Sequence, residues 1–385
     1  MISGCGKSGV CGESDGCSES GACREKVKFV SSPHTQMQRI SEFLSLLAVN
    51  SGVSGYEKPV ASLVKERFAP LADQVSEDNF GNVYALKRGL DSRAKIMLTA
   101  HIDEIGLIVT KIDSRGFLHF DAVGGMDQRT LLSQEVLVHG RKPVPGVIGS
   151  VPPHLLKEGE DENSAKMEDM IIDLGLSRQQ AAELVQIGDI ISIQREIYPL
   201  LNNLLAGKSL DDRAGVAAML VCLEELSRLR HNHDVLAVAT TQEEVGLRGA
   251  LTSAYTLNPD LAVVIDVTHG STPETKGQGT LELGKGPALG VGPNIHPGIY
   301  RQLTETAAER RIPVQTEPIS GSSGTDAWAI QVTKAGIPTG LLSIPLRYMH
   351  TSVETVDLQD VLDTGKLLAH FIASLPGDLE GLLCY

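Results

Sequence analysis

The sequence has 385 residues, of which 42% are apolar and 21% charged, the composition of an ordinary globular protein. Its formal net charge of −14 argues against a broad nucleic-acid-binding face, because such a face needs clustered Lys and Arg. The longest apolar run, residues 214–223, is far shorter than a membrane span of about 20 residues. We therefore expect a soluble protein of about two to three domains, with neither nucleic acid nor membrane as a partner.

The first 34 residues are rich in Gly and Ser and contain four regularly spaced cysteines, Cys5, Cys11, Cys17 and Cys23. Zinc-binding cysteines are usually separated by about two to four residues, so this wider spacing favours a flexible tail. A small zinc, iron–sulfur or redox site is the alternative for these thiols. No apolar stretch of signal-peptide length follows the first residues, so the cytoplasm is the expected location.

After the tail, apolar side chains recur with the spacing of amphipathic helices. This spacing predicts one helix over 37–47 and a second over 57–68, and a long helix follows at 211–230. Short apolar runs alternate with these helices. The predicted strands are 83–86, 96–100, 235–241, 261–265 and 341–344. Because these runs show little polar alternation, they indicate an α/β fold with strands buried on both faces of a mostly parallel sheet flanked by helices.

The stretch over residues 104–200 has a different pattern, with short alternating segments and many turn residues. Its predicted strands are 105–111, 117–121, 135–139, 147–150 and 190–193, with one helix near 177–185. This pattern indicates a small β-rich domain inserted into an α/β domain formed by residues 35–103 and 201–385. The short edge strands of such a domain need pairing or covering, which favours assembly through it.

Ionisable side chains stand directly after several predicted strands and at the start of the long helix. They are His101, Asp103, Asp211, Asp212, Glu243, Glu244, Asp266 and His350. In an open α/β sheet, ligands bind outside the carboxyl ends of the strands, where distant segments of the chain meet. A carboxylate is also favoured at the start of a helix by the helix dipole. The sequence therefore predicts one polar site built from distant parts of the chain.

Pairs of adjacent acids beside apolar strands would be costly without a cation to neutralise them. Two divalent ions would bring about four positive charges, which three carboxylates and one bridging hydroxide would balance. These carboxylates would be Asp211, Glu244 and Asp266, with His101 and His350 as neutral ligands. Mixed imidazole and carboxylate ligands suit zinc, cobalt or manganese rather than calcium.

Two further residues are given roles beside the metals. Asp103 lies two residues beyond His101, on the same side of an extended chain, and can hold the second nitrogen of that imidazole. Glu243 is left as an acid that binds no metal. Hydrolysis needs such an acid as the general base for a metal-bound water. The residues alone therefore predict a metal-dependent hydrolase.

Several of these strings resemble the M42 family of metallo-aminopeptidases, the tetrahedral (TET) group that also includes glutamyl aminopeptidases and proteins described as endoglucanases. The matching strings are AHIDEIG at 100–106, LDDRAG at 210–215, QEEVGLRGA at 242–250, DVT at 266–268 and MHT at 349–351. Further matches are GVIG at 146–149, PPHLL at 152–156 and GTDA at 324–327. The resemblance covers residues 37–375, in the order of the family.

The resemblance implies two divalent metal ions per subunit, zinc or cobalt. One ion would be bound by His101 and Asp266 and the other by Glu244 and His350. Asp211 would bridge the two ions. The family also has a cis peptide bond after its bridging aspartate, so one is expected directly after Asp211.

The resemblance also implies an activity and an assembly. Glu243 matches the catalytic base of the family, and Asp103 matches the acid that orients its metal site. The implied reaction removes N-terminal amino acids from peptides, by attack of the bridging hydroxide with Glu243 as general base. The inserted domain at 104–200 matches the dimerisation domain of the family. Family members commonly build dodecamers that enclose their active sites, so a homo-oligomer is expected, as a dodecamer built from dimers.

Two other functions are weighed against this one. A polysaccharide hydrolase would use two free carboxylates flanking the scissile bond, whereas most acids here are assigned to metals. A metal-binding relative without catalysis would be expected to lack a ligand or the base, and all are present. Asp326 has two interpretations, a place near the substrate side chain or a buried hydrogen-bonding role. The preferred N-terminal residue is not decided by the sequence.

Overall fold

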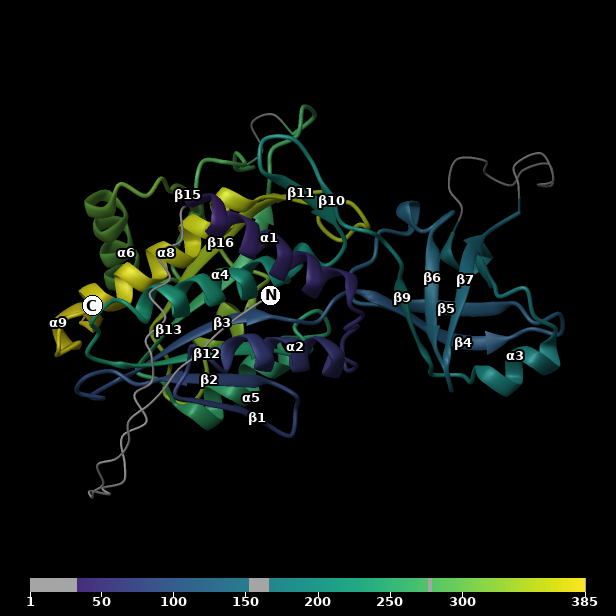
Figure 1. Cartoon of the computed structure of the whole chain (residues 1–385), viewed down its shortest axis with the longest axis horizontal. Coiled ribbons are helices and arrows are strands. Elements are labelled where there is room, and N and C mark those ends of the chain that lie inside the picture. The colour runs from purple at the N-terminus through teal and green to yellow at the C-terminus, as the bar shows by residue number, and fades with distance from the viewer. Residues whose placement is uncertain (1–32, 152–165, 276–278, 385) are drawn as a thin grey trace, which may run out of the picture.

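The computed structural model describes residues 33–151, 166–275 and 279–384. The four tail cysteines and the PPHLL string lie outside the described residues, so the expectations about them stay predictions. No helix within the described ranges is long and apolar enough to cross a membrane. The chain forms two bodies, a large sheet covered by helices and a smaller barrel beside it (Figure 1).

The centre of the large sheet is formed by four parallel strands. β3 (Lys95–His101) lies between β12 (Asp234–Thr240) and β13 (Leu261–His269), and β16 (Thr339–Arg347) pairs with β13. All four strands are buried along nearly their whole length, as their apolar sequences predict. Because parallel strands run in the same direction, their carboxyl ends meet at one edge of the sheet.

Antiparallel strands extend this centre on both sides. Next to β12 lies β2 (Val83–Lys87), followed by β1 (Gln74–Glu77). Next to β16 lies β17 (Glu354–Asp357), followed by β11 (Leu204–Gly207) and β10 (Tyr198–Pro199). β14 (Ala288–Val291) also pairs with β16, and β15 (Gln315–Pro318) pairs with β14. The predicted α/β class is confirmed. The parallel pairing, however, is concentrated at the centre, and the sheet as a whole is mixed.

Helices cover both faces of the sheet. One face is covered by α1 (Pro33–Val49), α2 (Lys58–Phe68), α4 (Leu210–Leu226), α6 (Pro297–Arg310) and α8 (Leu358–Ser374), with α9 (Glu380–Leu383) packed on α6. The other face carries α5 (Arg248–Leu257) and α7 (Asp326–Ile330). Strand side chains alternate between the two cores, so Ile96 and Leu98 of β3 pack on the α4 side and Met97 on the α5 side.

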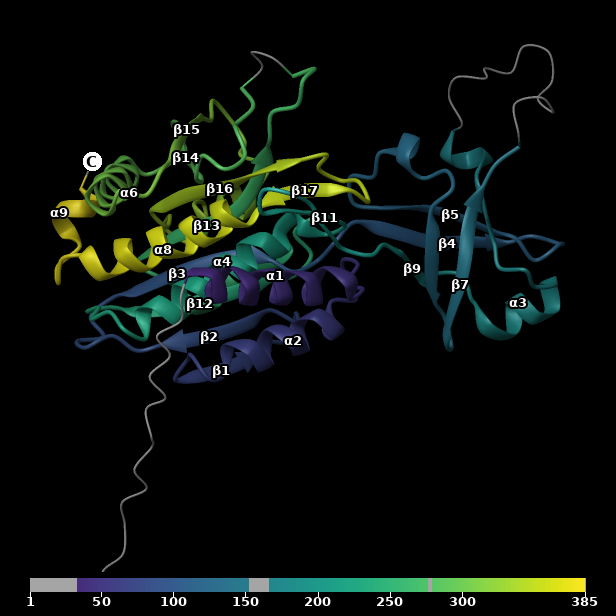
Figure 2. The ribbon, with the colours of Figure 1, turned by 45° about the horizontal axis from the view of Figure 1, so that its top comes forward.

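The inserted region folds as a closed six-stranded barrel. Around the barrel the strands are β4 (Gly106–Ile112), β5 (Leu118–Val123), β8 (Ile171–Asp173), β7 (Pro143–Gly149), β6 (Glu135–His139) and β9 (Ile190–Ile193). The short helix α3 (Arg178–Leu184) precedes β9, and the barrel has its own apolar core. It projects from one end of the sheet body (Figure 2). Because the described strands close on themselves, the expectation that free strand edges favour assembly is wrong.

Candidate metal centre

Four of the predicted site residues lie at the carboxyl ends of the central strands or in the segments directly after them. His101 is the last residue of β3, and Glu243 and Glu244 lie in the loop after β12. His350 lies in the turn after β16. The parallel pairing of these strands brings their carboxyl ends, and with them these side chains, to the same edge of the sheet.

Asp211 and Asp266 reach the same place from other positions. Asp211 lies near the start of α4, and the bond between Asp211 and Asp212 is cis, as the resemblance implies. Asp266 lies within β13, which continues to His269 instead of ending at the predicted residue 265, and it is paired with Ser343 of β16. All five predicted ligands and Glu243 line one cleft of about 530 Å³. This volume is within the range of small-ligand sites.

Asp211 is at the centre of the site. Its Oδ1 lies 3.0 Å from Nε2 of His101, and its Oδ2 lies 3.2 Å from Nε2 of His350. The same His350 nitrogen lies 3.4 Å from Oε1 of Glu244. Ligand atoms of His101, Asp211 and Glu244 lie within 4.8 Å of one another, close enough to hold a metal ion. The structure therefore brings four of the five predicted ligands into direct contact.

Asp266 and Glu243 lie outside this compact group. Both line the same cleft, and both are at least nine-tenths buried. Asp266 accepts a hydrogen bond at Oδ1 from the backbone N–H of Val267 at 2.7 Å. The cleft, rather than a direct contact, thus joins these two acids to the other site residues.

Asp103 orients two parts of the site at once. Its Oδ1 accepts a hydrogen bond from the backbone N–H of Glu243 at 3.0 Å, and its Oδ2 accepts one from that of Glu244 at 3.2 Å. The hydroxyl of Ser54 also donates to Oδ2, at 2.7 Å. Nδ1 of His101 lies 3.5 Å from Oδ1 and 3.2 Å from the backbone oxygen of Asp103. Asp103 therefore lies against the imidazole, as the sequence predicts, and also holds the loop that carries the two glutamates.

The site has more buried negative charge than its imidazoles can balance. Burial, together with the charge of nearby Asp266, raises the pKa of Glu243 to about 10, although His101 lowers it. Burial and the charge of Asp211 raise the pKa of Glu244 to about 7. The hydrogen bond with Asp211 raises the pKa of His350 to about 9. Divalent cations would neutralise this excess, and the imidazole and carboxylate donors suit zinc, cobalt or manganese, so the residues fit a metal site.

Glu354, which our reading of the sequence missed, also lies at the site. It is the first residue of β17, and its carboxylate accepts hydrogen bonds from the backbone N–H groups of Leu210, Asp211 and His350. The only local signal was an acid four residues after the predicted ligand His350. The backbone partners themselves cannot be read from the sequence, because they belong to segments far apart in the chain.

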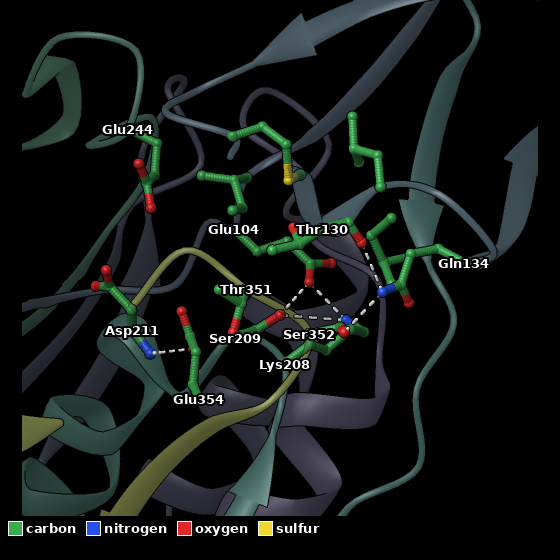
Figure 3. Close-up of a pocket in the computed structure, with 14 residues that line it drawn as sticks. Glu104, Thr130, Gln134, Lys208, Ser209, Asp211, Glu244, Thr351, Ser352 and Glu354 are labelled. Carbon is green, nitrogen blue, oxygen red and sulfur yellow. Dashed lines mark hydrogen bonds and ion pairs between the residues drawn. The ribbon is translucent and has the colours of Figure 1, made fainter. Parts of the chain in front are cut away.

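A small pocket separates the site from the barrel, and Asp211, Glu244 and Glu354 line one side of it (Figure 3). Its other side carries a buried ion pair, with Nζ of Lys208 lying 2.5 Å from Oε2 of Glu104. Glu104 lies in the link to the barrel, and Lys208 lies in the link to α4. This ion pair therefore ties together the two segments that lead to the barrel and to Asp211.

Asp326 takes the second of its two predicted roles. Its Oδ2 accepts a hydrogen bond from the hydroxyl of Thr240 at 2.6 Å, and its side chain is fully buried. The neighbouring Thr325, not Asp326, lines the cleft. The structure thus favours a buried hydrogen-bonding role over contact with a substrate side chain.

The cleft at the strand ends contains imidazole and carboxylate groups that can bind a metal ion. It also contains Glu243, an acid that lies outside the group of directly contacting ligands. The fold and this site together define a metal-dependent hydrolase of the α/β class. The family model described as M42 glutamyl aminopeptidase matches residues 81–367. The chain therefore belongs to the M42 family of aminopeptidases, metal-dependent enzymes that remove N-terminal residues from peptides.

Several proteins are similar to this chain over most of its length. The lysyl aminopeptidase of Pyrococcus furiosus is 38% identical over 339 residues, which are 87% of this chain and 97% of that protein. An aminopeptidase from the archaeon Desulfurococcus kamchatkensis has 39% identity and a TM-score of 0.82, covering 88% of this chain and 96% of its own. The TET1 peptidase of Pyrococcus horikoshii, which can assemble into a tetrahedron or a large octahedral shell, has 32% identity and a TM-score of 0.77. That match covers 87% of this chain and 100% of the TET1 chain.

Proposed function

We propose that this aminopeptidase works with two divalent metal ions, zinc or cobalt, in the cleft at the strand ends. The observation that carries this proposal is the position of Asp211, whose two carboxylate oxygens each face the Nε2 atom of a different imidazole. A carboxylate in this position can be shared by two ions. His101 and Asp266 would hold one ion. Glu244 and His350, whose side chains lie 3.4 Å apart, would hold the other.

Glu243 is the proposed general base. Bound metal ions supply Lewis-acid polarisation of the peptide carbonyl and lower the pKa of water. Glu243 takes the proton from the attacking water and returns it to the leaving amine. A general base works best with a pKa near the operating pH, and neighbouring cations lower a carboxyl pKa that burial alone raises. Asp103 keeps Glu243 in place through the backbone N–H of that residue.

Hydrolysis of aminoacyl-p-nitroanilides tests this function. The protein should lose activity in a chelator and regain it when zinc or cobalt is added back, and metal analysis should give two ions per chain. Full activity of the chelated, metal-free protein would contradict the proposal. A parallel assay on soluble cellulose tests the polysaccharide hydrolase, and metal binding without hydrolysis of either substrate would indicate an inactive relative. A panel of aminoacyl substrates then identifies the preferred N-terminal residue.

The two bodies of the fold are given separate roles in this proposal. Residues 35–103 and 201–385 form the catalytic domain, and the inserted domain, residues 104–200, makes the contacts between subunits. The proposed assembly is a dodecamer built from dimers. Support comes from the TET1 peptidase, a relative that can assemble into a tetrahedron. The cytoplasmic location and the flexible cysteine tail stay predictions from the sequence.

A further inference from the structure

Glu354 is a buried acid at the site to which the proposed chemistry gives no role. Its side chain is 2% exposed. Oε2 accepts hydrogen bonds from the backbone N–H groups of Leu210 at 2.7 Å and Asp211 at 3.1 Å. Oε1 accepts one from the backbone N–H of His350 at 2.8 Å. Both carboxylate oxygens are therefore occupied as acceptors, and all three donors are main-chain groups.

These three donors belong to two segments that are distant in the sequence. Leu210 and Asp211 begin α4, whereas His350 lies in the turn between β16 and β17. Asp211 and His350 also face each other through their side chains, at 3.2 Å. One carboxylate thus holds the backbone of both partners of a central contact of the site. Figure 3 shows Glu354 beside Asp211 with the hydrogen bond between them.

We infer that Glu354 is a positioning residue of the metal centre, which fixes the distance between the bridging carboxylate of Asp211 and the imidazole of His350. This inference rests on the proposed roles of Asp211 and His350 as metal ligands. Groups that hold metal ligands in place typically change metal affinity by about 10- to 100-fold when they are replaced. The ion shared by Asp211 and His350 is the one that depends on this distance.

The three contacts require an acceptor oxygen at both positions of the side-chain carboxyl group. A glutamine at position 354 would keep one acceptor oxygen, but its NH₂ group would face an N–H donor in place of the other. Either His350, or Leu210 together with Asp211, would then lose its acceptor, and a buried donor without an acceptor is costly. The shorter Glu354→Asp side chain keeps both oxygens but draws them back by one methylene. It should therefore have a smaller effect than Glu354→Gln.

A matched control separates positioning from a general loss of stability. Asp360 in α8 is also a fully buried carboxylate, and its two oxygens accept hydrogen bonds from the backbone N–H groups of Gly284 and Gly286, both at 2.7 Å. It does not line the metal cleft. Asp360→Asn should therefore weaken the fold through lost backbone contacts of the same kind, without touching the metal ligands.

The experiment measures metal binding by Glu354→Gln, Glu354→Asp, Asp360→Asn and the unmodified full-length protein. Competition with a chromophoric chelator gives the affinity for Zn²⁺ and Co²⁺, the Co²⁺ absorption spectrum reports ligand geometry, and thermal unfolding of the metal-free forms reports stability. We expect Glu354→Gln to bind one ion about 10- to 100-fold more weakly, with an altered Co²⁺ spectrum. Glu354→Asp should lie between this variant and the unmodified protein. Asp360→Asn should keep the affinity and the spectrum of the unmodified protein.

Two results would overturn the inference, and they are distinguishable from failure of the proposed function. One is unmodified affinity and spectrum in Glu354→Gln. The other is an equal loss of metal in Asp360→Asn, which would show that the effect follows stability alone. If Glu354→Gln does not fold, the same comparison is made with Glu354→Asp. An unmodified protein that binds no Zn²⁺ or Co²⁺ would instead overturn the proposed function, and the inference with it.

Discussion

The backbone carbonyl of Gly125 accepts a hydrogen bond from Nδ1 of His350 at 2.8 Å. Gly125 lies in the loop after β5, so a residue of the inserted region contacts a predicted ligand of the main domain. A carbonyl oxygen can only accept, so Nδ1 must carry the proton. Nε2 faces Asp211 and Glu244, and when a metal ion replaces its proton this nitrogen has the lone pair that a metal ligand needs.

This contact predicts that Gly125→Ala impairs the metal site. An added Cβ would lie 2.9 Å from Nδ1 and 3.2 Å from Cε1 of His350, so the imidazole or the loop must move. We expect metal affinity to fall by about 10- to 100-fold, measured by chelator competition. Gly149→Ala, in β7 of the same barrel, is the control, because its Cβ would meet no atom within 4 Å. Equal affinities in the two variants would refute the prediction.

Glu243→Gln and Asp211→Asn should fail in different ways. A missing general base typically lowers turnover by about 10²- to 10⁴-fold, so Glu243→Gln should lose kcat while its metal content stays near two ions per chain. Asp211→Asn weakens the ligand proposed to be shared by both ions, so it should lose metal. Turnover of an aminoacyl-p-nitroanilide and metal analysis of the purified variants are the two measurements. Similar metal contents in both variants would show that the roles are wrongly assigned.

The enzyme should require a free amino terminus on its substrate. The cleft is lined by buried carboxylates, among them Glu243, which can accept hydrogen bonds from the terminal amine of a peptide, and a metal ion would bind the lone pair of that amine in its neutral form. We expect that acetylating the N-terminus of a good peptide substrate stops its cleavage, as followed by mass spectrometry of the products. Steady release of acetylated amino acids would contradict this expectation.

The buried pair of Glu104 and Lys208 should stabilise the fold in a pH-dependent way. Burial alone raises the pKa of Glu104, but the charges of Lys208 and Arg213 hold it at about 2. Because this value is below that of an unfolded glutamate, about 4.3, the stabilisation is complete above that pH. It is lost as the pH falls toward about 2. Lys208→Met leaves this buried carboxylate without its nearest cation and should cost about 3–5 kcal/mol at pH 7.

Urea unfolding at pH 7 and at lower pH measures this difference. The gap between Lys208→Met and the unmodified protein should narrow at acidic pH, because Glu104 becomes protonated in the folded variant, where Lys208 no longer lowers its pKa, before it does so in the unmodified protein. The exposed pair of Lys65 and Glu77, 2.8 Å apart, provides the control. Lys65→Met should cost no more than about 1 kcal/mol. A gap that stays the same down to pH 3 would refute the assignment.

The protein should form a large homo-oligomer, with twelve chains as the expected number. The similar PhTET1 structure is a dodecamer, and the inserted domain is the proposed contact between subunits. Light scattering at micromolar concentration measures the mass directly. A single species of 41.1 kDa, the mass of one chain, would contradict the prediction. A dimer would contradict the predicted number of twelve chains but would agree with assembly from dimers.

Much of the fold could be predicted because local patterns of apolar residues in the sequence indicate its helices and strands. The apolar runs at 96–100 and 261–265 correspond to β3 and β13, and the helical spacing at 37–47 corresponds to α1. These patterns report which residues are buried, and burial of both faces is enough to indicate a central parallel strand. They do not report the neighbours of an edge strand. The antiparallel edges of the sheet and the closure of the barrel therefore appeared only in the structure.

The sequence by itself determined the residue types of the site and their order along the chain. His101 and Glu244 were predicted because they follow buried strands, and Asp211 because it opens the long helix. The structure brings ligand atoms of these three residues within 4.8 Å of one another. Only the tertiary structure decided what holds them. Glu354 accepts hydrogen bonds from backbone N–H groups at the site, and the backbone carbonyl of Gly125 accepts one from His350. The partners are separated by up to 225 residues in the sequence. Every residue has a backbone C=O acceptor, and every residue except proline has a backbone N–H donor. Such contacts therefore cannot be predicted from residue types and depend on how the chain is folded.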